Sequence, residues 1–321
     1  MQIKISGLHI LGNNKMDMNE ANQSSVTEFL LLGFPTVTGY KAVIFFMGIL
    51  IIYILTLTIN TMVIVLVSIK SQLHSPMYFF LQQLSLIESV FLTVLVPRML
   101  HVIWLEGATV SIPGCIAQTY FCCASGCTEC YLLTVMAYDR YLAICNPLRY
   151  SAIMNIRLQR LLAIYCWVFG FLITQITLGF LCQLQFCGSN VINHFFCDVV
   201  PFIELSCTYQ MALQLEIMII SIPIVLIPFI LIITSYVCVF ITILGISSTT
   251  GRKKAFSTCS SHLTVVTIYF VTDITTYSVP ANGDTLTLNK SLAFLFTVVT
   301  PLFNPIIYCL RNREMRAVLT K

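Results

Sequence analysis

Long apolar runs separated by short polar segments dominate this chain. A transmembrane helix needs about 20 consecutive, mostly apolar residues, and seven runs are long enough to supply one each. They cover residues 42–69, 76–100, 115–140, 158–181, 211–244, 254–280 and 291–310. The sixth run is the weakest, because Ser, Thr, His262 and Asp273 interrupt it. The pattern predicts an all-α membrane protein, a bundle of seven transmembrane helices.

Polar or mixed segments precede, connect and follow these runs. Residues 1–40 contain no run long enough to span a membrane or to act as a cleaved signal sequence, so we expect a tail there. Residues 41–310 would form the transmembrane domain, with polar loops at 101–114 and 182–209 and a turn at Pro147 and Arg149. Residues 311–321 have the pattern of a short, basic amphipathic helix that ends the chain.

Composition and charge placement support this prediction and give it a direction. The chain is 58% hydrophobic and 9% charged, whereas soluble domains carry roughly 25% charged residues, so the ordinary water-soluble class is excluded. Twelve of the 17 Lys and Arg residues fall at the helix ends that share a side with residue 321. The positive-inside rule makes that side cytosolic, which predicts a multi-pass plasma-membrane protein with an extracellular N-terminal tail. Asn22 lies in a glycosylation sequon, which agrees with this orientation.

Four polar residues interrupt the apolar runs. They are Asn60, Glu88, Glu129 and Asn304. Counting about 1.5 Å per residue from the cytosolic helix ends places all four in the lower middle of the bilayer. Buried carboxylates normally face a water-filled interior, and two that lie close together would share a proton or a cation. They form either a structural network or a switch whose hydration or bound cation depends on the state, and we favour the switch.

An Asp-Arg-Tyr triplet, Asp139 to Tyr141, lies at the cytosolic end of the third run. It puts the Arg140 guanidinium where hydrocarbon meets water, which is costly unless the charge is paired, and Asp139 is the adjacent partner. The triplet belongs to MAYDRYLAICNPLRY, residues 136–150, while KAFSTCSSHLTVV, residues 254–266, opens the sixth run. These stretches resemble odorant receptors of the land-vertebrate (class II) type, a branch of the rhodopsin-like (class A) G-protein-coupled receptors.

The resemblance, which spans residues 27–319, implies a function and a set of switch residues. It implies a receptor that binds a small volatile odorant and activates a stimulatory olfactory heterotrimeric G protein, with no cofactor and no nucleic acid. The coupling and switch residues would be Asp139, Arg140, Tyr141, Tyr236, Lys254, Asn304, Pro305 and Tyr308. Tyr236 and Tyr308 would meet Arg140 once the sixth helix swings out; the alternative is that both are interfacial belt residues. The chain departs from the family at Phe270, where Tyr is usual, and at Val271, where Gly is usual.

Four cysteines lie near the predicted outer surface. Cys115 opens the third run, and Cys187, Cys197 and Cys207 lie in the long polar loop. An oxidising compartment favours bridges, four cysteines permit three pairings, and free thiols or a zinc site with His194 are the alternatives. The stretch FCGSNVINHFFCD, residues 186–198, resembles the family's second outer loop. That likeness implies the pairs Cys115–Cys197 and Cys187–Cys207.

A face of small and polarizable residues marks the outer half of the third run. Cys122, Cys123, Gly126 and Cys127 recur at helical spacing and share one face, which by the family pattern lines the ligand cavity; ordinary core cysteines or a thiol-bridged metal site are the alternatives. The expected lining on other helices is Glu216, Ile220, Ser221, Asp273, Ile274, Tyr277, Phe294 and Thr297. At about 25 cal/mol per Å² of buried apolar surface, a small odorant would bind with micromolar affinity at best. Asp273 is either a counter-ion for an amine or a protonated, hydrogen-bonded acid.

Other function classes lack their characteristic residues. A light receptor needs a Lys in the seventh run for a Schiff base, and residues 291–310 contain none. An aminergic receptor expects Asp where Cys122 stands. The alternatives kept are a small-molecule transporter, which would need a polar path across the bundle, and a non-olfactory rhodopsin-like receptor. We do not expect an enzyme, because no nucleophile–base pair or metal motif is evident. The family's usual distance from start to sequon leaves Met1, Met16 and Met18 as candidate first residues.

Overall fold

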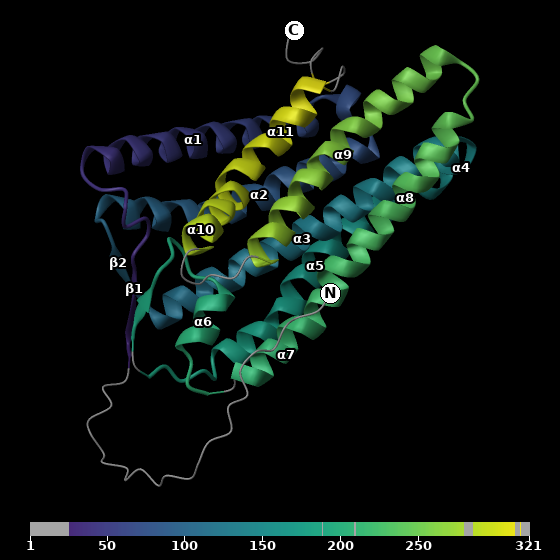
Figure 1. The fold of residues 1–321 in the computed structure, drawn as a ribbon. Coiled ribbons are helices and arrows are strands. Elements are labelled where there is room, and N and C mark those ends of the chain that lie inside the picture. The colour runs from purple at the N-terminus through teal and green to yellow at the C-terminus, as the bar shows by residue number, and fades with distance from the viewer. Residues whose placement is uncertain (1–25, 188, 209, 279–284, 312–314, 316–321) are drawn as a thin grey trace, which may run out of the picture.

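The computed structural model describes residues 26–187, 189–208, 210–278, 285–311 and 315. Long helices lie side by side in one bundle, and a small sheet covers one end of it (Figure 1). The first four spans are α1 (Tyr40–Ile69), α2 (Pro76–Trp104), α3 (Ile112–Cys145) and α5 (Ile156–Leu181). The fifth comprises α7 (Gln210–Ser221), a π-helical segment (Ile222–Leu226) and α8 (Ile227–Leu244). The sixth is α9 (Thr249–Ser278), and the seventh comprises α10 (Leu286–Phe294), a π-helical segment (Leu295–Val299) and α11 (Thr300–Arg311).

The seven predicted runs form helices wherever the structure describes them, which confirms the predicted fold class. Within the described residues, five helical stretches are long and apolar enough to cross a membrane: Tyr40–Ile69, Pro76–Trp104, Ile156–Leu181, Met211–Leu244 and Thr287–Tyr308. The other two long helices, α3 and α9, are more polar. In α9 several threonine hydroxyls are satisfied inside the helix: Thr264 donates to the Ser260 carbonyl at 2.7 Å and Thr272 to the Ile268 carbonyl at 2.7 Å. Such local bonds make a Thr-rich helix compatible with a membrane.

Several segments that the sequence predicted as loops or turns contain regular structure. The helix α2 continues past residue 100 to Trp104 and is followed by β2 (Ala108–Ser111). The expected turn at Pro147 is the helix α4 (Pro147–Ile153), which begins with a proline that suits a first helical turn. The loop 182–209 holds β3 (Val191–Ile192) and α6 (Val199–Leu205), and a single 3₁₀ turn (Ser71–Leu73) joins α1 to α2. All are too short for hydrophobic periodicity to reveal them.

A three-stranded sheet lies where the sequence predicted only an irregular tail and loops. Its central strand is β1 (Glu28–Leu31), which pairs antiparallel with β2 and parallel with β3. Phe29 of β1 is fully buried and meets Phe186 and Phe202 edge to face, with ring centroids 4.9 and 5.6 Å apart. The sheet therefore ties the N-terminal segment to the two outer connections of the bundle.

A buried lysine holds the same outer layer to the seventh span. Lys290 on α10 donates to the carbonyl of Gly33 at 2.8 Å and to Oδ1 of Asn193 at 2.6 Å. The neighbouring His194 is buried as well, and this burial, together with the charge of Lys290, lowers the pKa of His194 to about 3. The outer layer thus contains one buried cation and one histidine that stays neutral at physiological pH.

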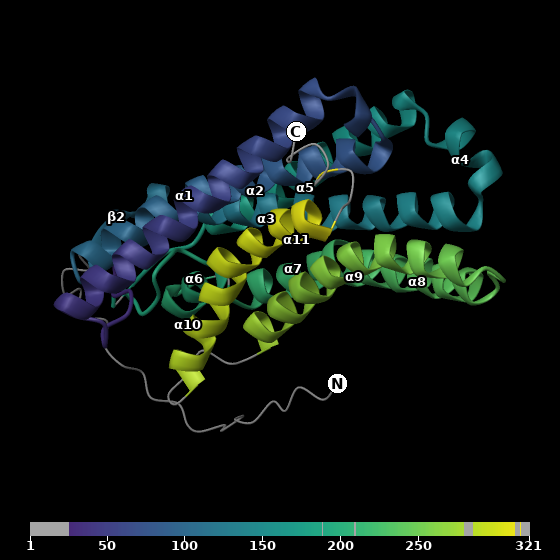
Figure 2. The same ribbon diagram turned by 90° about the horizontal axis from the view of Figure 1, so that it is seen from above.

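The helix α3 runs through the middle of the bundle and contacts α2, α5, α8 and α9 (Figure 2). It approaches α5 closely at Gly170, where an added Cβ would lie 2.3 Å from Oγ1 and 2.9 Å from the backbone N of Thr128. Ser111 and Asn155 cap the N-termini of α3 and α5, since their side-chain oxygens accept hydrogen bonds from Gly114 N and Leu158 N. Several of the functional candidates discussed below lie on α3 itself.

Candidate functional site

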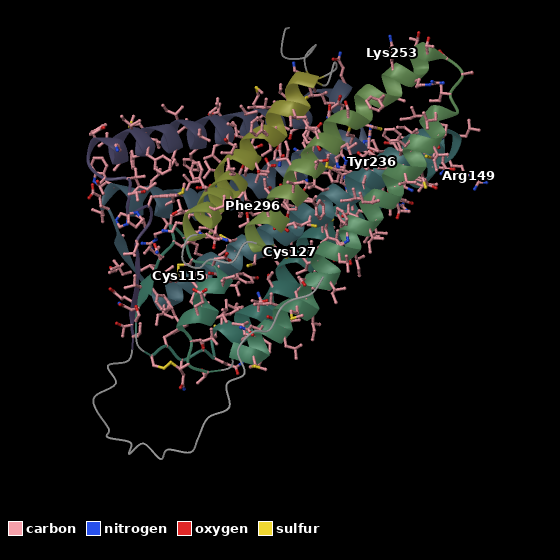
Figure 3. All side chains as sticks on the ribbon, in the orientation of Figure 1. Cys115, Cys127, Arg149, Tyr236, Lys253 and Phe296 are labelled. Carbon is pink, nitrogen blue, oxygen red and sulfur yellow. A yellow bond between two sulfur atoms is a disulfide. The ribbon has the colours of Figure 1, made fainter. Side chains whose placement is uncertain are left out.

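The bundle has two distinct ends, which we call the outer end, beside the sheet, and the inner end, beside α4 and the α8–α9 connection. Figure 3 shows Cys115 at the outer end, Arg149 and Lys253 at the inner end, and Cys127 and Tyr236 between them. The predicted switch residues cluster towards the inner end. The predicted ligand-binding residues lie towards the outer end.

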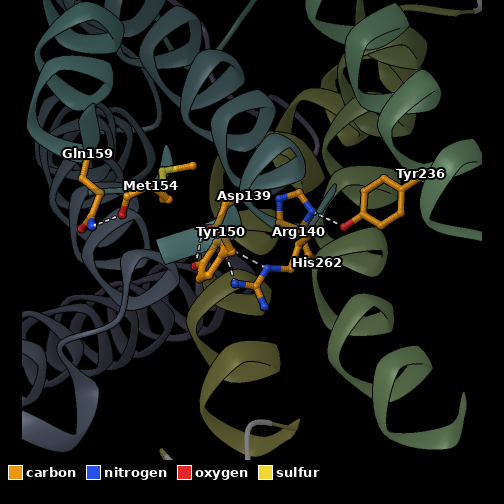
Figure 4. Close-up of polar contacts among 7 residues, drawn as sticks. All are labelled: Asp139, Arg140, Tyr150, Met154, Gln159, Tyr236 and His262. Carbon is orange, nitrogen blue, oxygen red and sulfur yellow. Dashed lines mark hydrogen bonds and ion pairs between the residues drawn. The ribbon is translucent and has the colours of Figure 1, made fainter. Parts of the chain in front are cut away.

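At the inner end, the last turns of α3 hold a buried ion pair (Figure 4). Arg140 donates from Nε and Nη2 to Oδ2 of Asp139. Oδ1 of Asp139 accepts a hydrogen bond from the Tyr150 hydroxyl on α4 at 2.8 Å. Burial and the adjacent Asp139 carboxylate raise the pKa of Tyr150, which therefore remains a donor. The sequence pointed to Asp139 as partner of Arg140 but not to Tyr150, since the helix that carries Tyr150 was predicted as a turn.

A second polar pair joins α8 to α9 close to Arg140. The Tyr236 hydroxyl lies 2.5 Å from Nδ1 of His262, and both side chains are buried. His262 was not among the predicted switch residues, although it lies in the signature stretch 254–266. The sequence indicated it only as a histidine within an apolar run. That its partner is a tyrosine on the preceding long helix is seen in the structure. The pair links the fifth and sixth spans.

The remaining predicted switch residues occupy the same end. Tyr308 on α11 is buried, and its hydroxyl has no hydrogen-bond partner among the described residues. Pro305 is buried inside α11, while Tyr141 is half-buried on α3 and stacks with Tyr138 at 6.4 Å. Lys254 lies in α9, and its side chain is outside the described part of the chain.

The four interior polar residues meet in the middle of the bundle. Asn304 donates from Nδ2 to Oε1 of Glu88 and, at 3.1 Å, to Oε1 of Glu129. Asn60 is fully buried and lies against Glu88, but its amide forms no hydrogen bond of ordinary geometry with the described residues. The second carboxylate oxygen of Glu88 and Oδ1 of Asn304 are also unpartnered among those residues. Two carboxyls that share one amide and leave acceptors unused form a site where a proton, water or cation would relieve the electrostatic cost.

Two disulfides tie the outer end together. They are Cys115–Cys197, which joins α3 to the segment between β3 and α6, and Cys187–Cys207, which joins the segment before β3 to the residues after α6. These are the pairs that the family resemblance implied. Gln118 reinforces the first, because its Oε1 accepts from Cys197 N at 3.0 Å while its Nε2 donates to the Val94 carbonyl at 3.0 Å. Asn22 lies outside the described residues.

The predicted ligand-binding residues of α3 face the interior of the outer half. Cys127 is buried, and Cys122 and Cys123 are half-buried. The carbonyl of Gly126 accepts a hydrogen bond from the Tyr269 hydroxyl on α9 at 2.9 Å. Tyr269 immediately precedes Phe270, so a hydroxyl does reach α3 from this turn of α9, one position earlier than the family pattern suggests.

Of the other predicted lining residues, some are buried or half-buried and some are exposed. Asp273 and Ile220 are half-buried, and Thr297 is buried and donates to the Ala293 carbonyl at 2.8 Å. Phe294 packs in an aromatic cluster with Phe34, Phe45 and Phe195.

Two predicted lining residues lie on exposed helix faces instead. Ile274 is 46% exposed and shares a face with exposed Val271, and Ser221 is exposed and bonds to the Met218 carbonyl at 2.8 Å. Residues three apart share one side of a helix, so Ile274 lies on the exposed side with Val271, and Ser221 lies on the exposed side with Met218. Neither position favours a place in the ligand cavity. The side chain of Tyr277 is outside the described residues.

A buried acid on α7 adds to this outer half. Glu216 accepts a hydrogen bond from the Thr177 hydroxyl on α5 at 2.8 Å. Its second carboxylate oxygen is buried and has no partner among the described residues. Glu216 was expected as a neighbour of Ile220 on the fifth span, and its unused oxygen makes it a further polar group available to a ligand.

The bundle of seven spans, the ion pair at the inner end of α3 and the disulfide-tied outer loop define a rhodopsin-like, G-protein-coupled type of membrane receptor. Comparison with known proteins places the chain within this class. A family profile described as "Olfactory receptor" matches residues 49–321.

Curated relatives agree over nearly the whole chain. Olfactory receptor 6B1 of Homo sapiens is 44% identical over 304 residues, which is 95% of this chain and 97% of that protein. Olfactory receptor 6P1 of Homo sapiens is 41% identical over 95% of this chain and 96% of that protein. Olfactory receptor 226 of Rattus norvegicus is 42% identical over 95% of this chain and 94% of that protein. The chain belongs to the olfactory receptor family; it is a multi-pass plasma-membrane receptor and not an enzyme.

Proposed function

We propose that this receptor binds a small volatile ligand between the outer halves of its helices and activates a stimulatory heterotrimeric G protein, raising cyclic AMP. The observation that carries the proposal is the closed inner end, where Arg140 is held by Asp139 and Tyr236 is held by His262. A ligand that binds better to an open packing shifts the population towards it. Arg140 would then exchange Asp139 for Tyr236 and the unpartnered hydroxyl of Tyr308.

The proposed ligand site uses the interior face of α3 and its neighbours. Its residues are Cys122, Cys123, Gly126, Cys127, Ile220, Asp273 and Thr297, with Phe294 at the outer edge and Tyr277 completing the sixth span. Burial of a small apolar molecule supports micromolar binding at best. The Tyr269–Gly126 hydrogen bond connects this site to α9, the helix that would move.

Asp273 decides between two ligand classes. As a counter-ion it would favour an amine, and as a protonated acid it would only hydrogen-bond. We favour the protonated acid, because half-burial among apolar helices disfavours a lone carboxylate. An Asp273→Asn receptor should therefore keep its agonist profile, and selective loss of amine agonists would contradict this assignment.

The interior polar cluster is proposed as the state-dependent element. Glu88 and Glu129 would hold a proton or a cation in the closed packing, with Asn304 and Asn60 as neutral partners. Support comes from the unused oxygen of Glu88, which leaves the site undersatisfied. Glu129→Gln should shift basal cyclic AMP and remove any sodium dependence of agonist affinity, while leaving surface delivery intact.

The topology is proposed from charge placement. The N-terminal tail, residues 1–40, would be extracellular and glycosylated at Asn22, residues 41–310 would form the transmembrane domain, and residues 311–321 the cytoplasmic tail. Asn22→Gln should remove the glycosidase-sensitive mobility shift of the surface receptor. An antibody against a tag at the N-terminus should label intact cells.

A cyclic AMP screen against an odorant panel tests the coupling. Arg140→Ala should abolish agonist-driven nucleotide exchange while surface labelling stays at the wild-type level. Arg160→Ala is the matched control, because Arg160 is exposed at the same end of the bundle, on α5, and should respond normally. An unchanged Arg140→Ala response would refute the proposal, and ligand flux in receptor-containing vesicles would favour a transporter instead.

A further inference from the structure

A groove runs between α8 and α9 on the surface of the bundle. Residues 236–243 of α8 and 256–268 of α9 line a volume of about 370 Å³. This lies within the roughly 300–1,000 Å³ range of small-molecule sites. The groove exists because α8 packs closely on α3 but only loosely on α9. It is separate from the outer ligand site and from the Glu88–Glu129 cluster.

The walls of the groove are apolar although several residues carry hydroxyls. Thr264 and Thr267 donate to the Ser260 and Leu263 carbonyls of their own helix, both at 2.7 Å. A ligand in the groove would therefore contact the methyl groups of these threonines. Phe240 and Phe256 meet edge to face at 5.8 Å near the inner end, and they are 43% and 50% exposed. Such a surface suits a hydrocarbon chain and offers little to a polar ligand.

The length of the groove matches one leaflet of a bilayer. Twelve residues separate Phe256 from Ile268, which is about 18 Å along a helix axis. Half of a hydrocarbon core of roughly 30 Å is about 15 Å. A chain that entered at the inner membrane surface would reach close to the midplane at Ile268.

Two basic residues lie at the inner mouth of the groove. Arg252 and Lys253 are exposed, one turn before Phe256, and Lys253 lies at the tip of α9 in Figure 3. Arg252 donates from one terminal nitrogen to the carbonyls of Ile246 at 2.9 Å and Leu244 at 3.5 Å, and a guanidinium has five N–H donors in all. Residues 236–268 contain no Asp or Glu. Neither α8 nor the part of α9 that lines the groove therefore supplies a carboxylate to neutralise these two charges.

We propose that this groove binds one anionic phospholipid, with an acyl chain between α8 and α9 and the phosphate headgroup on Arg252 and Lys253. A phosphate diester accepts charge-assisted hydrogen bonds from the guanidinium and the ammonium. Cytoplasmic leaflets are rich in such lipids, which agrees with the proposed topology. Because Tyr236 lines the groove and also holds His262, a seated lipid touches the pair that keeps α8 and α9 together.

The test uses the full-length receptor in nanodiscs of phosphatidylcholine alone or mixed with phosphatidylserine. Native mass spectrometry counts lipids that stay bound when the disc is released. We expect one retained phosphatidylserine and a preference over phosphatidylcholine of roughly tenfold or more, given two basic contacts. Equal retention of both lipids would overturn the proposal. No odorant or G protein takes part, so failure here would leave the coupling proposal untouched.

Two variants and their controls locate the lipid. The double variant Arg252→Gln, Lys253→Gln should lose the preference, whereas Arg157→Gln, Arg160→Gln, which removes two exposed charges from α5 at the same end, should keep it.

The second variant fills the groove. Thr267→Trp should abolish retention of the lipid, and Ile241→Trp, on the exposed face of α8 outside the groove, should not. Retention by Thr267→Trp would place the lipid elsewhere and refute the site.

A third measurement needs no variant. Phosphatidylserine with a photoreactive acyl chain should label peptides from residues 256–268 of the wild-type receptor. Labelling confined to other helices would contradict the proposal, even if a tryptophan variant failed to fold.

Discussion

The close approach of α5 to α3 depends on the missing side chain of Gly170. A Cβ there would lie 2.3 Å from Oγ1 of Thr128, 2.9 Å from its backbone N and 3.2 Å from the Ala124 carbonyl oxygen. The hydroxyl cannot simply turn away, because Thr128 is fully buried and donates to that same carbonyl at 2.8 Å. Two of the three clashing atoms belong to the backbone, so Gly170→Ala must push the helices apart.

The expected cost follows from overpacking, which destabilises by about 1–3 kcal/mol. The gain in helix propensity from Gly to Ala, about 1 kcal/mol, offsets part of it. Gly179→Ala is the matched control, because it is in the same helix and its Cβ would meet nothing within 4 Å. Only the propensity gain should remain there, so the two variants should differ by about 1–3 kcal/mol.

Thermal unfolding of the purified receptor, followed by thiol-reactive dye, measures this difference. The melting temperature of Gly170→Ala should lie below that of Gly179→Ala, and its surface delivery should fall in parallel. The double variant Gly170→Ala, Thr128→Ala should recover part of the loss, since it removes the nearest atom but not the backbone contacts. If Gly170→Ala proves as stable as Gly179→Ala, the helices are not packed as described.

Three further predictions concern the outer end. Lys290→Met should speed amide exchange in the first strand, because it removes charge-assisted hydrogen bonds of about 1.5–3 kcal/mol, whereas Lys41→Met, at an exposed site, should not. Since burial lowers the pKa of His194 from 6.5 to about 3, the unfolded chain binds the proton first. Outer-loop stability should therefore fall as the pH drops from about 6.5 towards 3, by at most ~1.4 kcal/mol per pH unit, and a His194→Gln melting series should be flatter. Cys115→Ser should abolish surface delivery, because losing such a bridge costs about 2–5 kcal/mol, while Cys182→Ser, which alters an exposed free thiol, should be delivered normally.

The long helices could be predicted from the sequence, because a run of about 20 apolar residues satisfies its backbone hydrogen bonds within a bilayer by forming a helix. The ends of α2 and the short helices could not, since their boundaries depend on tertiary partners. The strand β1 is the clearest case: the buried Phe29 packs against Phe186 and Phe202, which lie more than 150 residues further along the chain. The hydrophobic pattern predicts that a residue will be buried, but it does not predict which distant residue will pack against it.

The site was predictable where chemistry is local. Arg140 and Asp139 are adjacent, and the interior carboxyls stand out in apolar runs, so both could be identified directly. His262 and Tyr269 were missed as partners because their roles depend on the rotation of α9 against α8 and α3. A helical period gives relative positions on one helix, while the contact between two helices depends on crossing geometry that one sequence does not specify. For the same reason Ile274 was predicted to line the ligand cavity, whereas it lies on an exposed face of α9.

The central place of β1 in its sheet has a consequence for biosynthesis. Leu30 pairs with Val191, and Glu28 with Ser111, so the earliest part of the chain waits for partners that the ribosome makes much later. Contacts so distant along the chain form slowly, because a long loop must close first. During that interval the edges of β1 are unpaired and open to chaperones or to strands of another nascent copy. The sheet can therefore be completed only after residues 191 and 192 have been synthesised.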